Sequence, residues 1–301
     1  MEQTKGTKAR TLILSLLVMA LWGSLYPMIT IGYRAFAINT SSIADILVFA
    51  AVRFTVCGAI VCGIGAFKRE KLQRPKLKNV ALITAMGLFA IVLHYAFVYV
   101  GLSMTDASKG ALLKQLGVLL YVCFAFLFFK DEKFSIYKII GALIGFVGIF
   151  AINAGDGIGG WNMGDVLVLL ASVCTVVSNV MSKKSVEGNS PYWVTGISQF
   201  SGGLILLAAG LAMGGKFPVF TWQAAGVFAY ICTASVVAYT LWYYVQRIAD
   251  LSSLFIIKFA EPLFACVFSA MWIGEDIFKL QYLVAFLLIS GGILLANMKK
   301  K

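Results

Sequence analysis

Four charged residues stand inside long apolar runs of the sequence, where a charge is costly. Arg53 lies in one such run, Lys114 in the segment LLKQLG, and Lys258 and Glu261 together in IIKFAEP. A charge at the centre of a membrane helix costs roughly 2.5–3.5 kcal/mol on insertion scales, and residues of this kind are commonly functional. Lys258 and Glu261 are three positions apart, so on a helix they share a face and can form an ion pair. Lys114 is then predicted to have no acidic partner.

The two lysines allow two interpretations. Each lies about 9 Å from one end of its apolar run at about 1.5 Å per residue, and from that depth a lysine stem can carry its ammonium to the headgroups. Alternatively, both ammonium groups line a central cavity and bind an anionic group of a substrate. Pro262 follows Glu261 directly and predicts a kink, which is tolerated where the backbone lines a cavity. A purely structural interpretation, in which Pro262 shapes packing and Glu261 neutralises Lys258, stays open.

Arg53 and His94 carry weaker functional signals. For Arg53, a structural role bonded to carbonyl groups at a helix end is favoured over a substrate-binding or gating role. His94 is the only histidine of the chain, and a lone histidine predicts no metal site of ordinary spacing. Histidine titrates near neutral pH and could relay protons, although a packing role is the more common one. No metal and no cofactor are expected.

Aromatic residues recur at a spacing of four, which places both members of a pair on one face of a helix. The deeper ones are candidates for the wall of a substrate cavity, and an aromatic wall beside a basic group suits an amphipathic carboxylate such as an amino acid. The outer ones fit an aromatic belt at the membrane interface. The cavity candidates are Trp22, Tyr26, Tyr95 and Tyr239, and the belt candidates are Tyr99 and Tyr243.

The elements that must position these side chains are predicted to be membrane-spanning helices. Of the 301 residues, 60% are hydrophobic and 13% charged, whereas soluble domains carry about 25% charged residues. Ten apolar runs approach the spanning length of about 20 residues, and long continuous runs exclude a β-barrel. We therefore expect an all-α membrane protein with ten spans. They lie at about 11–31, 44–67, 80–102, 107–129, 136–153, 164–182, 191–213, 222–246, 251–272 and 278–297.

The net charge of +12 follows the sides of the membrane and does not form a nucleic-acid surface. With ten spans, the basic clusters at the N-terminus, 68–78, 130–138, 183–184 and 299–301 all lie on one side. The positive-inside rule makes that side cytoplasmic and puts both termini there, in a multi-pass protein of the cytoplasmic membrane. The first run lacks an A-x-A-like cleavage site and is expected to be a retained helix. The six cysteines lie in apolar runs and are expected to be buried and unpaired.

An internal repeat relates the two halves of the chain, 1–154 and 155–301. Sliding the sequence by 144 positions aligns Tyr95 with Tyr239 and aligns Lys114 with Lys258. Each half contains five predicted helices, and because five is odd, the second half enters the membrane from the opposite side. Inverted repeats of this kind are typical of secondary transporters, whose site lies near the midplane between the halves.

Glycines recur on the runs that close each half. Small residues three or four positions apart allow helices to approach closely. We expect them to pack between the halves, and contact in a homodimer is the weaker alternative. The residues concerned are Gly141, Gly145 and Gly148 in the first half and Gly291 and Gly292 in the second.

Two long segments resemble the hallmark segments of the EamA family of the drug/metabolite transporter superfamily. They are YVGLSMTDASKGALLKQLGVLLYVCFAFLFFKDEKFS and YYVQRIADLSSLFIIKFAEPLFACVFSAMWIGEDIFK, and further matches are ALWGSLYP, Arg53-Phe54, GALIGFVGIFAIN and ISGGILLAN. The resemblance covers nearly the whole chain. It implies ten helices and export or exchange of small metabolites, including amino acids. The first half departs from the family by having Gly117-Val118 where a proline is frequent, whereas the second half keeps Glu261-Pro262.

The predicted function is secondary active transport of a small organic metabolite, an amino acid or another carboxylate or anion, by alternating access. The expected partners are that small molecule and the lipid bilayer, with no nucleic acid. A membrane-embedded enzyme is disfavoured because the sequence has no H-E-x-x-H, no G-x-S-x-G and no paired intramembrane carboxylates. A non-coupled channel or a scaffold membrane protein is the alternative.

Overall fold

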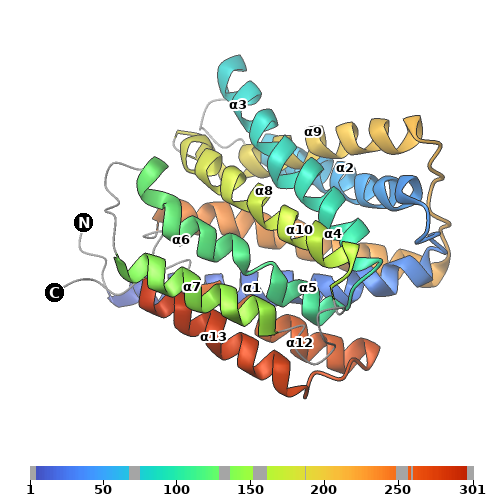
Figure 1. Ribbon diagram of the computed structural model, residues 1–301. Helices are drawn as coiled ribbons and strands as arrows, with labels where there is room; N and C mark the ends of the chain where they lie inside the picture. The colour runs from blue at the N-terminus through green and yellow to red at the C-terminus, as the bar shows by residue number, and fades with distance from the viewer. Residues whose placement is uncertain are drawn as a thin grey trace.

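The computed structural model describes residues 5–67, 75–128, 136–151, 161–186, 188–248, 257–258 and 260–296, and within these ranges the regular secondary structure is helical throughout. The helices run side by side in one bundle (Figure 1). The described part of the chain contains six helices long and apolar enough to cross a membrane. The all-helical membrane class predicted from composition agrees with this bundle. The stretches of the predicted spans at 129, 152–153, 251–256, 259 and 297 lie outside the described residues.

Five of the long helices are uninterrupted. They are α1 (Lys5–Ala35), α2 (Ile43–Phe67), α8 (Met163–Val186), α9 (Pro191–Ala212) and α10 (Trp222–Ile248). The sixth, Leu77–Leu102, is built from α3 (Leu77–Gly87), a π-helical stretch (Leu88–Leu93) and α4 (His94–Leu102). Because a π-helix shifts the register of the turns that follow, such stretches often occur at functional sites, and this one ends directly before His94.

The remaining helices are shorter. The predicted run 107–129 is divided into α5 (Ala107–Leu113) and α6 (Leu116–Phe128), with a turn at Lys114 and Gln115. In the second half, Lys258 also lies in a turn, and α12 (Ala260–Ile273) begins two residues later. Pro262 is therefore in the first turn of α12, where its missing N–H leaves no partner unsatisfied. Most of the segment before it, in which the predicted kink would appear, lies outside the described residues. The bundle is completed by α7 (Ile136–Ala151) and α13 (Leu280–Ala296).

The closest helix pairs join the first half of the chain to the second. α2 packs along α9, and α7 packs along α13. α1 packs against α10 and α12, while its counterpart in the second half, α8, packs against α4 and α6. By order along the two halves, α1 corresponds to α8, α2 to α9, α4 to α10, α6 to α12 and α7 to α13. When each helix is exchanged for its counterpart, the same set of pairs results. The interior of the bundle is thus built mainly from contacts between the halves.

Glycines permit the close approach of α2 and α9. On α9 they recur at every seventh position, Gly196, Gly203 and Gly210, and a Cβ at any of them would meet α2 backbone or side-chain atoms. At Gly210, for example, the added atom would lie 2.8 Å from Val48. Interfaces of small residues let membrane helices pack by van der Waals contact. This glycine row was visible in the sequence but was not among the predicted packing residues.

Of the two glycines of α13 that were predicted to pack between the halves, one makes the contact with α7. A Cβ at Gly292 would meet the carbonyl group of Gly141 and the amide nitrogen of Gly145. Gly291, which was predicted to pack alongside Gly292, faces open space. Gly292 therefore supplies the close approach on α13, and its neighbour does not.

Candidate functional site

A cavity of about 50 Å³ lies at the centre of the bundle, between α1, α4, α8, α10 and the two interrupted segments. Seven of the eight predicted substrate-binding residues line it. The eighth, Tyr26, lines a smaller cavity next to it. The lining residues of the central cavity are Trp22, Ala90, His94, Tyr95, Lys114, Thr175, Ser178, Asn179, Tyr239, Trp242, Tyr243, Lys258 and Glu261.

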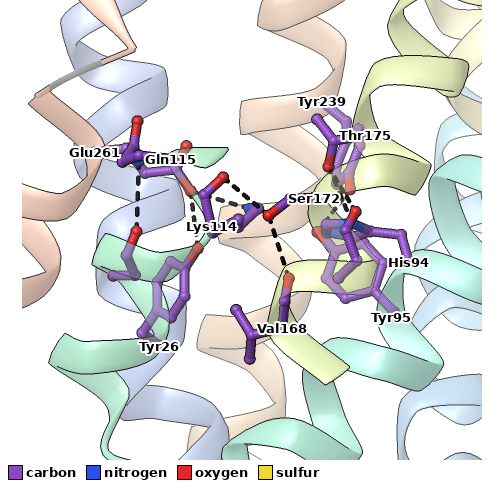
Figure 2. Close-up of polar contacts among 12 residues, drawn as sticks. Tyr26, His94, Tyr95, Lys114, Gln115, Val168, Ser172, Thr175, Tyr239 and Glu261 are labelled. Atoms are coloured by element: carbon purple, nitrogen blue, oxygen red, sulfur yellow. Dashed lines mark hydrogen bonds and ion pairs between the residues drawn. The ribbon is translucent and has the colours of Figure 1, made fainter. Parts of the chain in front are cut away.

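An ion pair between the two halves lies in the wall of this cavity. Glu261 Oε1 accepts a hydrogen bond from Lys114 Nζ at 3.1 Å and another from the Tyr26 hydroxyl at 3.2 Å (Figure 2). The carboxylate is buried, with 3% of the residue exposed. The prediction that Lys114 lacks an acidic partner is wrong, because its partner lies 147 residues away along the chain. The prediction used the spacing of residues along a single helix, which pairs Glu261 with Lys258 and contains no information about contacts between helices.

The backbone around Lys114 is held by tertiary contacts. The Lys114 carbonyl accepts a hydrogen bond from Gly117 N at 3.1 Å, and the Ser172 hydroxyl of α8 lies 3.2 Å from the same oxygen (Figure 2). A Cβ at Gly117 would lie 2.8 Å from the Ser172 carbonyl, so glycine is what allows α8 to come this close. The turn directs Lys114 into the bundle, toward Glu261.

Lys258 is held by aromatic rings. Its ammonium nitrogen lies 4.9 Å from the Trp242 ring centroid and 5.6 Å from that of Trp22. Only 6% of the residue is exposed, and cation–π attraction is strongest where water is excluded. Trp22 also packs against Tyr239 with ring centroids 5.5 Å apart. Trp242 was not predicted as a site residue, although it lies three positions after Tyr239 and so on the same helix face.

The polar part of the wall supplied by α8 was also missed. Thr175, Ser178 and Asn179 line the cavity, but the first helix of each half aligns poorly in the repeat, so no signal singled them out. Among the described residues, two buried cavity donors, Trp22 Nε1 and Asn179 Nδ2, have no hydrogen-bond partner. The ionised lining groups are two lysines and one glutamate. The cavity therefore offers an excess of donors and of positive charge, which suits a ligand rich in acceptors.

His94 ties α4 to α8 at the edge of the cavity. Its Nδ1 lies 2.9 Å from the Ala171 carbonyl and 3.1 Å from the Thr175 hydroxyl (Figure 2). A carbonyl oxygen can only accept, so Nδ1 carries a hydrogen and, in the neutral ring, Nε2 is the acceptor. The imidazole also packs edge-on against Tyr95, with ring centroids 4.7 Å apart. These contacts fix the ring in place.

Two repeat-related tyrosines meet at the centre of the site. The hydroxyl groups of Tyr95 and Tyr239 are 2.6 Å apart and join α4 to α10 (Figure 2). Tyr95 also borders a second cavity of about 20 Å³, together with Trp22 and Lys114. The other residues around this second cavity are Leu25, Tyr26, Ile29 and Val98. Trp22, Tyr95 and Lys114 therefore form a partition between two small cavities.

Arg53 is fully buried beside the site and is bound by hydroxyl groups. Its Nε and Nη2 donate to the Ser235 hydroxyl at 3.0 and 2.6 Å, and Nη1 donates to the Tyr99 hydroxyl at 2.5 Å. The predicted partners, carbonyl groups at a helix end, are not the ones observed. Tyr99 and Tyr243 are 0% and 4% exposed, so their prediction as interfacial belt residues is wrong. Both face the interior because α4 and α10 present that side to the other half of the chain.

The described residues contain no cluster of His, Cys, Asp or Glu that could hold a metal ion. Five cysteines of this part of the chain are free thiols, namely Cys57, Cys62, Cys174, Cys232 and Cys266. The side chain of the sixth, Cys123, lies outside the described set.

Known proteins similar to this chain include uncharacterized transporters and a WAT1-related protein. The uncharacterized transporter YvbV of Bacillus subtilis is 25% identical over 299 residues, covering 98% of this chain and 93% of its own length. The WAT1-related protein At3g02690, chloroplastic, of Arabidopsis thaliana is 26% identical over 250 residues, covering 77% of this chain and 58% of its own length. A crystal structure superposes with a TM-score of 0.68 over 96% of this chain and 97% of that chain, at 17% identity, which shows the fold alone.

The model of the EamA-like transporter family matches in two blocks, at residues 9–154 and 162–298. The blocks span nearly all of the sequence and include every residue of the cavity wall described above. The chain belongs to the EamA-like transporter family, in the drug/metabolite transporter superfamily.

Proposed function

We propose that this membrane transporter is a secondary transporter of a small organic anion, such as a carboxylate or an amino acid, working by alternating access as an exporter or exchanger. The observation that carries the proposal is the composition of the central cavity. Among the lining residues that the structure describes, Lys114 and Lys258 face one carboxylate, that of Glu261, which already accepts two hydrogen bonds. A substrate that brings its own negative charge would complete the balance.

The remaining polar groups suit the same substrate class. The Trp22 indole N–H and the Asn179 amide are buried donors that line the cavity beside the Lys258 ammonium. A carboxylate could accept from such donors, and charge-assisted hydrogen bonds are about twice as strong as neutral ones. The rings of Trp22, Tyr239 and Trp242 would cover an apolar side chain. An amino acid would in addition bring an ammonium group that Glu261 can bind.

The architecture proposed with this function is ten spans in two inverted five-helix repeats, at 1–154 and 155–301. The symmetric set of helix pairs between the halves supports it, and so does the match of the family model in two blocks. In Figure 1, α1 begins at the same end of the bundle at which α13 ends. Together with the one-sided basic clusters, this favours a location in the cytoplasmic (inner) membrane with both termini on the cytoplasmic side.

The proposal is tested first by ligand stabilisation. We expect the thermal unfolding temperature of the detergent-purified protein to rise with one class of amino acids, other carboxylates or phosphorylated metabolites. The rise should be lost in Lys258→Met and in Asn179→Ala, and retained in Lys216→Met, which changes an exposed lysine outside the cavity. Stabilisation by organic cations alone would contradict an anionic substrate.

Counterflow then separates a carrier from a channel. Proteoliposomes preloaded with the stabilising compound should take up the labelled compound faster than empty ones. The reason is that the binding site of a carrier must return across the membrane after each uptake step, and internal compound allows it to return occupied. Flux without such trans-stimulation would support the channel alternative, and the absence of flux would support a scaffold. Lys114→Ala and Lys258→Ala should each slow counterflow, and wild-type rates in both variants would remove the cavity from the mechanism.

A further inference from the structure

The helix α5 is a buried segment that leads directly into the Lys114 turn. Every residue from Ala107 to Leu113 is buried, including Lys109, which is 8% exposed. The helix is surrounded by α1, α4, α8 and α12. Because Lys114 follows its last residue, any displacement of α5 moves the ammonium relative to Glu261.

The N-terminus of α5 is capped from the other half of the chain. Glu275, in the loop after α12, accepts hydrogen bonds from Ala107 N at 2.9 Å and Ser108 N at 3.0 Å through its two carboxylate oxygens, and from the Ser108 hydroxyl at 2.5 Å. The first N–H groups of a helix have no partner within the helix, and a carboxylate there is further favoured by the helix dipole. One glutamate thus satisfies three donors at the start of α5.

A local cap is present in the sequence and stands unused. Asp106 occupies the N-cap position of α5 in an extended conformation, and its side chain makes no capping hydrogen bond. Aspartate is among the residues most favoured at this position. The start of α5 therefore has two alternative carboxylates, one on its own chain segment and one brought by the loop at Glu275.

The loop geometry that brings Glu275 depends on glycine. α12 ends at Ile273, and Gly274 has a φ of +69°, in the left-handed region. Glycine is favoured directly after a helix because it adopts this conformation without a steric penalty. The reversal carries Glu275 back over the start of α5.

A second acidic residue holds the same region from α8. Asp165 is fully buried; its Oδ2 lies 2.9 Å from Lys109 Nζ, and its Oδ1 accepts from the Thr105 hydroxyl at 2.7 Å. Asp165 and Asn162 also bond reciprocally through side chain and backbone at the start of α8, in the manner of a capping box. The segment on both sides of Asp106 is thereby attached to a rigid helix end.

We propose that Glu275 is a removable cap that holds α5 closed over the Lys114–Glu261 pair, and that Asp106 takes over as the cap when this end of the bundle opens. The proposal rests on the transport function, since it assigns Glu275 as a positioning residue for the closed state. Exchange of one carboxylate for another keeps the helix N-terminus satisfied in both states. Without the exchange, opening would leave the two backbone N–H groups that Glu275 binds, those of Ala107 and Ser108, without their capping carboxylate.

Site-directed labelling tests the exchange. The reporter is Ala111→Cys, a fully buried position of α5, treated with a membrane-impermeant maleimide from each side of sealed vesicles, with the parent chain as background. Glu275→Gln should raise the labelling rate roughly tenfold from one side only, as expected for the loss of a charge-assisted hydrogen bond. Asp106→Ala should lower it about fivefold, as expected for the loss of an N-cap, and Asp106→Asn, which can still cap, should restore it.

Asp276→Asn is the matched control. It removes the same charge from the same loop, but Asp276 bonds only to Phe278 N in its own loop among the contacts the structure gives it, so labelling should not change. Opposite effects of Glu275→Gln and Asp106→Ala are not expected if the two residues only support folding. The proposal would be overturned if Ala111→Cys is labelled at the same rate with and without Glu275→Gln. It would also be overturned if Glu275→Gln and Asp106→Ala change the labelling rate in the same direction.

The readout does not depend on a substrate. If the protein proves to be a channel or a scaffold, the labelling rates still report on the cap. Conversely, trans-stimulated counterflow with unchanged labelling would refute the cap exchange and leave the transport function standing. Asp106 is exposed, so the Asp106→Ala variant retains the packing of the bundle even if Glu275→Gln unfolds.

Discussion

At the scale of single residues, the site is organised by one carboxylate that the repeat does not duplicate. The position that corresponds to Glu261 in the first half is Gly117, 144 residues earlier. Lys114 and Lys258, in contrast, are present in both halves. The two lysines therefore have equivalent places but different surroundings, one on the carboxylate and one between two tryptophan rings. This asymmetry gives the cavity its excess positive charge.

Removal of the carboxylate should be more harmful than removal of the whole ion pair. In Glu261→Gln, the half-buried Lys114 and the buried Lys258 lose their counter-charge, and breaking a buried pair typically costs about 3–5 kcal/mol. In the double variant Lys114→Met/Glu261→Gln, the unpaired ammonium at 114 is gone as well, so the loss should be smaller than in Glu261→Gln alone. Unfolding of the purified variants in detergent measures both effects.

The double-mutant cycle needs Lys114→Met alone as its fourth corner, beside the parent protein, Glu261→Gln and the double variant. A coupling free energy well above 0.5 kcal/mol is expected for groups in direct contact. Additive losses in the cycle would show that the 3.1 Å contact contributes nothing to stability. Lys216→Met, at an exposed position, controls for the loss of one positive charge from the protein.

Residue types at the site were easier to predict than their partners. Two positions stood out because the repeat shows the same residue in both halves: Lys114 matches Lys258, and Tyr95 matches Tyr239. Their contacts could not be derived in the same way, because Lys114 reaches Glu261 and Tyr95 reaches Tyr239 across more than 140 residues of chain. Such pairs depend on which helices are neighbours, and no local spacing rule contains that information.

At the scale of elements, the interruption at Lys114 is the feature that composition conceals. The segment LLKQLG contains no proline, and its glycine lies after the turn, so propensity alone favours one continuous helix. The helix is divided because Ser172 and the close approach of α8 at Gly117 hold the turn. In the second half, Pro262 did signal an irregularity, at the start of a helix.

Adjacent glycines of α13 provide a test of the contact between the halves. Gly292→Ala should destabilise the protein, because the new methyl group would meet the backbone of α7 at Gly141, which cannot move aside easily. Overpacking of this kind typically costs about 1–3 kcal/mol. Gly291→Ala points into open space and should be neutral or stabilising by up to about 1 kcal/mol, because alanine favours the helix.

Thermal unfolding in detergent distinguishes the two variants. They differ in position by one residue and carry the same substitution, so each is the control for the other. Equal stability of both would mean that α7 and α13 are not in close contact. The homodimer alternative predicts the opposite result. A contact between two copies of the protein would use the exposed glycine, so Gly291→Ala would then be the destabilising change.

At the scale of the whole molecule, the class of the fold was the most predictable feature. Hydropathy and run length are sufficient for an all-helical membrane protein, because a membrane span must satisfy its own backbone hydrogen bonds. The pairing of helices was not predictable in detail, although an inverted repeat requires that contacts come in symmetric sets. The glycines at 196, 203 and 210, which permit the α2–α9 contact, were informative in the sequence once their partner helix was known.

The orientation of the molecule leads to a prediction about two loops at opposite ends of the bundle (Figure 1). Lys76, before α3, and Lys216, between α9 and α10, are both exposed. The positive-inside rule places Lys76 in the cytoplasm and Lys216 outside. In intact cells, an impermeant maleimide should therefore label Lys216→Cys and leave Lys76→Cys unlabelled until the membrane is opened. Lys184→Cys, exposed at the end of α8, should follow Lys76→Cys, because both lie on the predicted basic side. Labelling of all three from outside would contradict the span count, and a reversed pattern would invert the orientation and, with it, the end of the bundle that Glu275 closes.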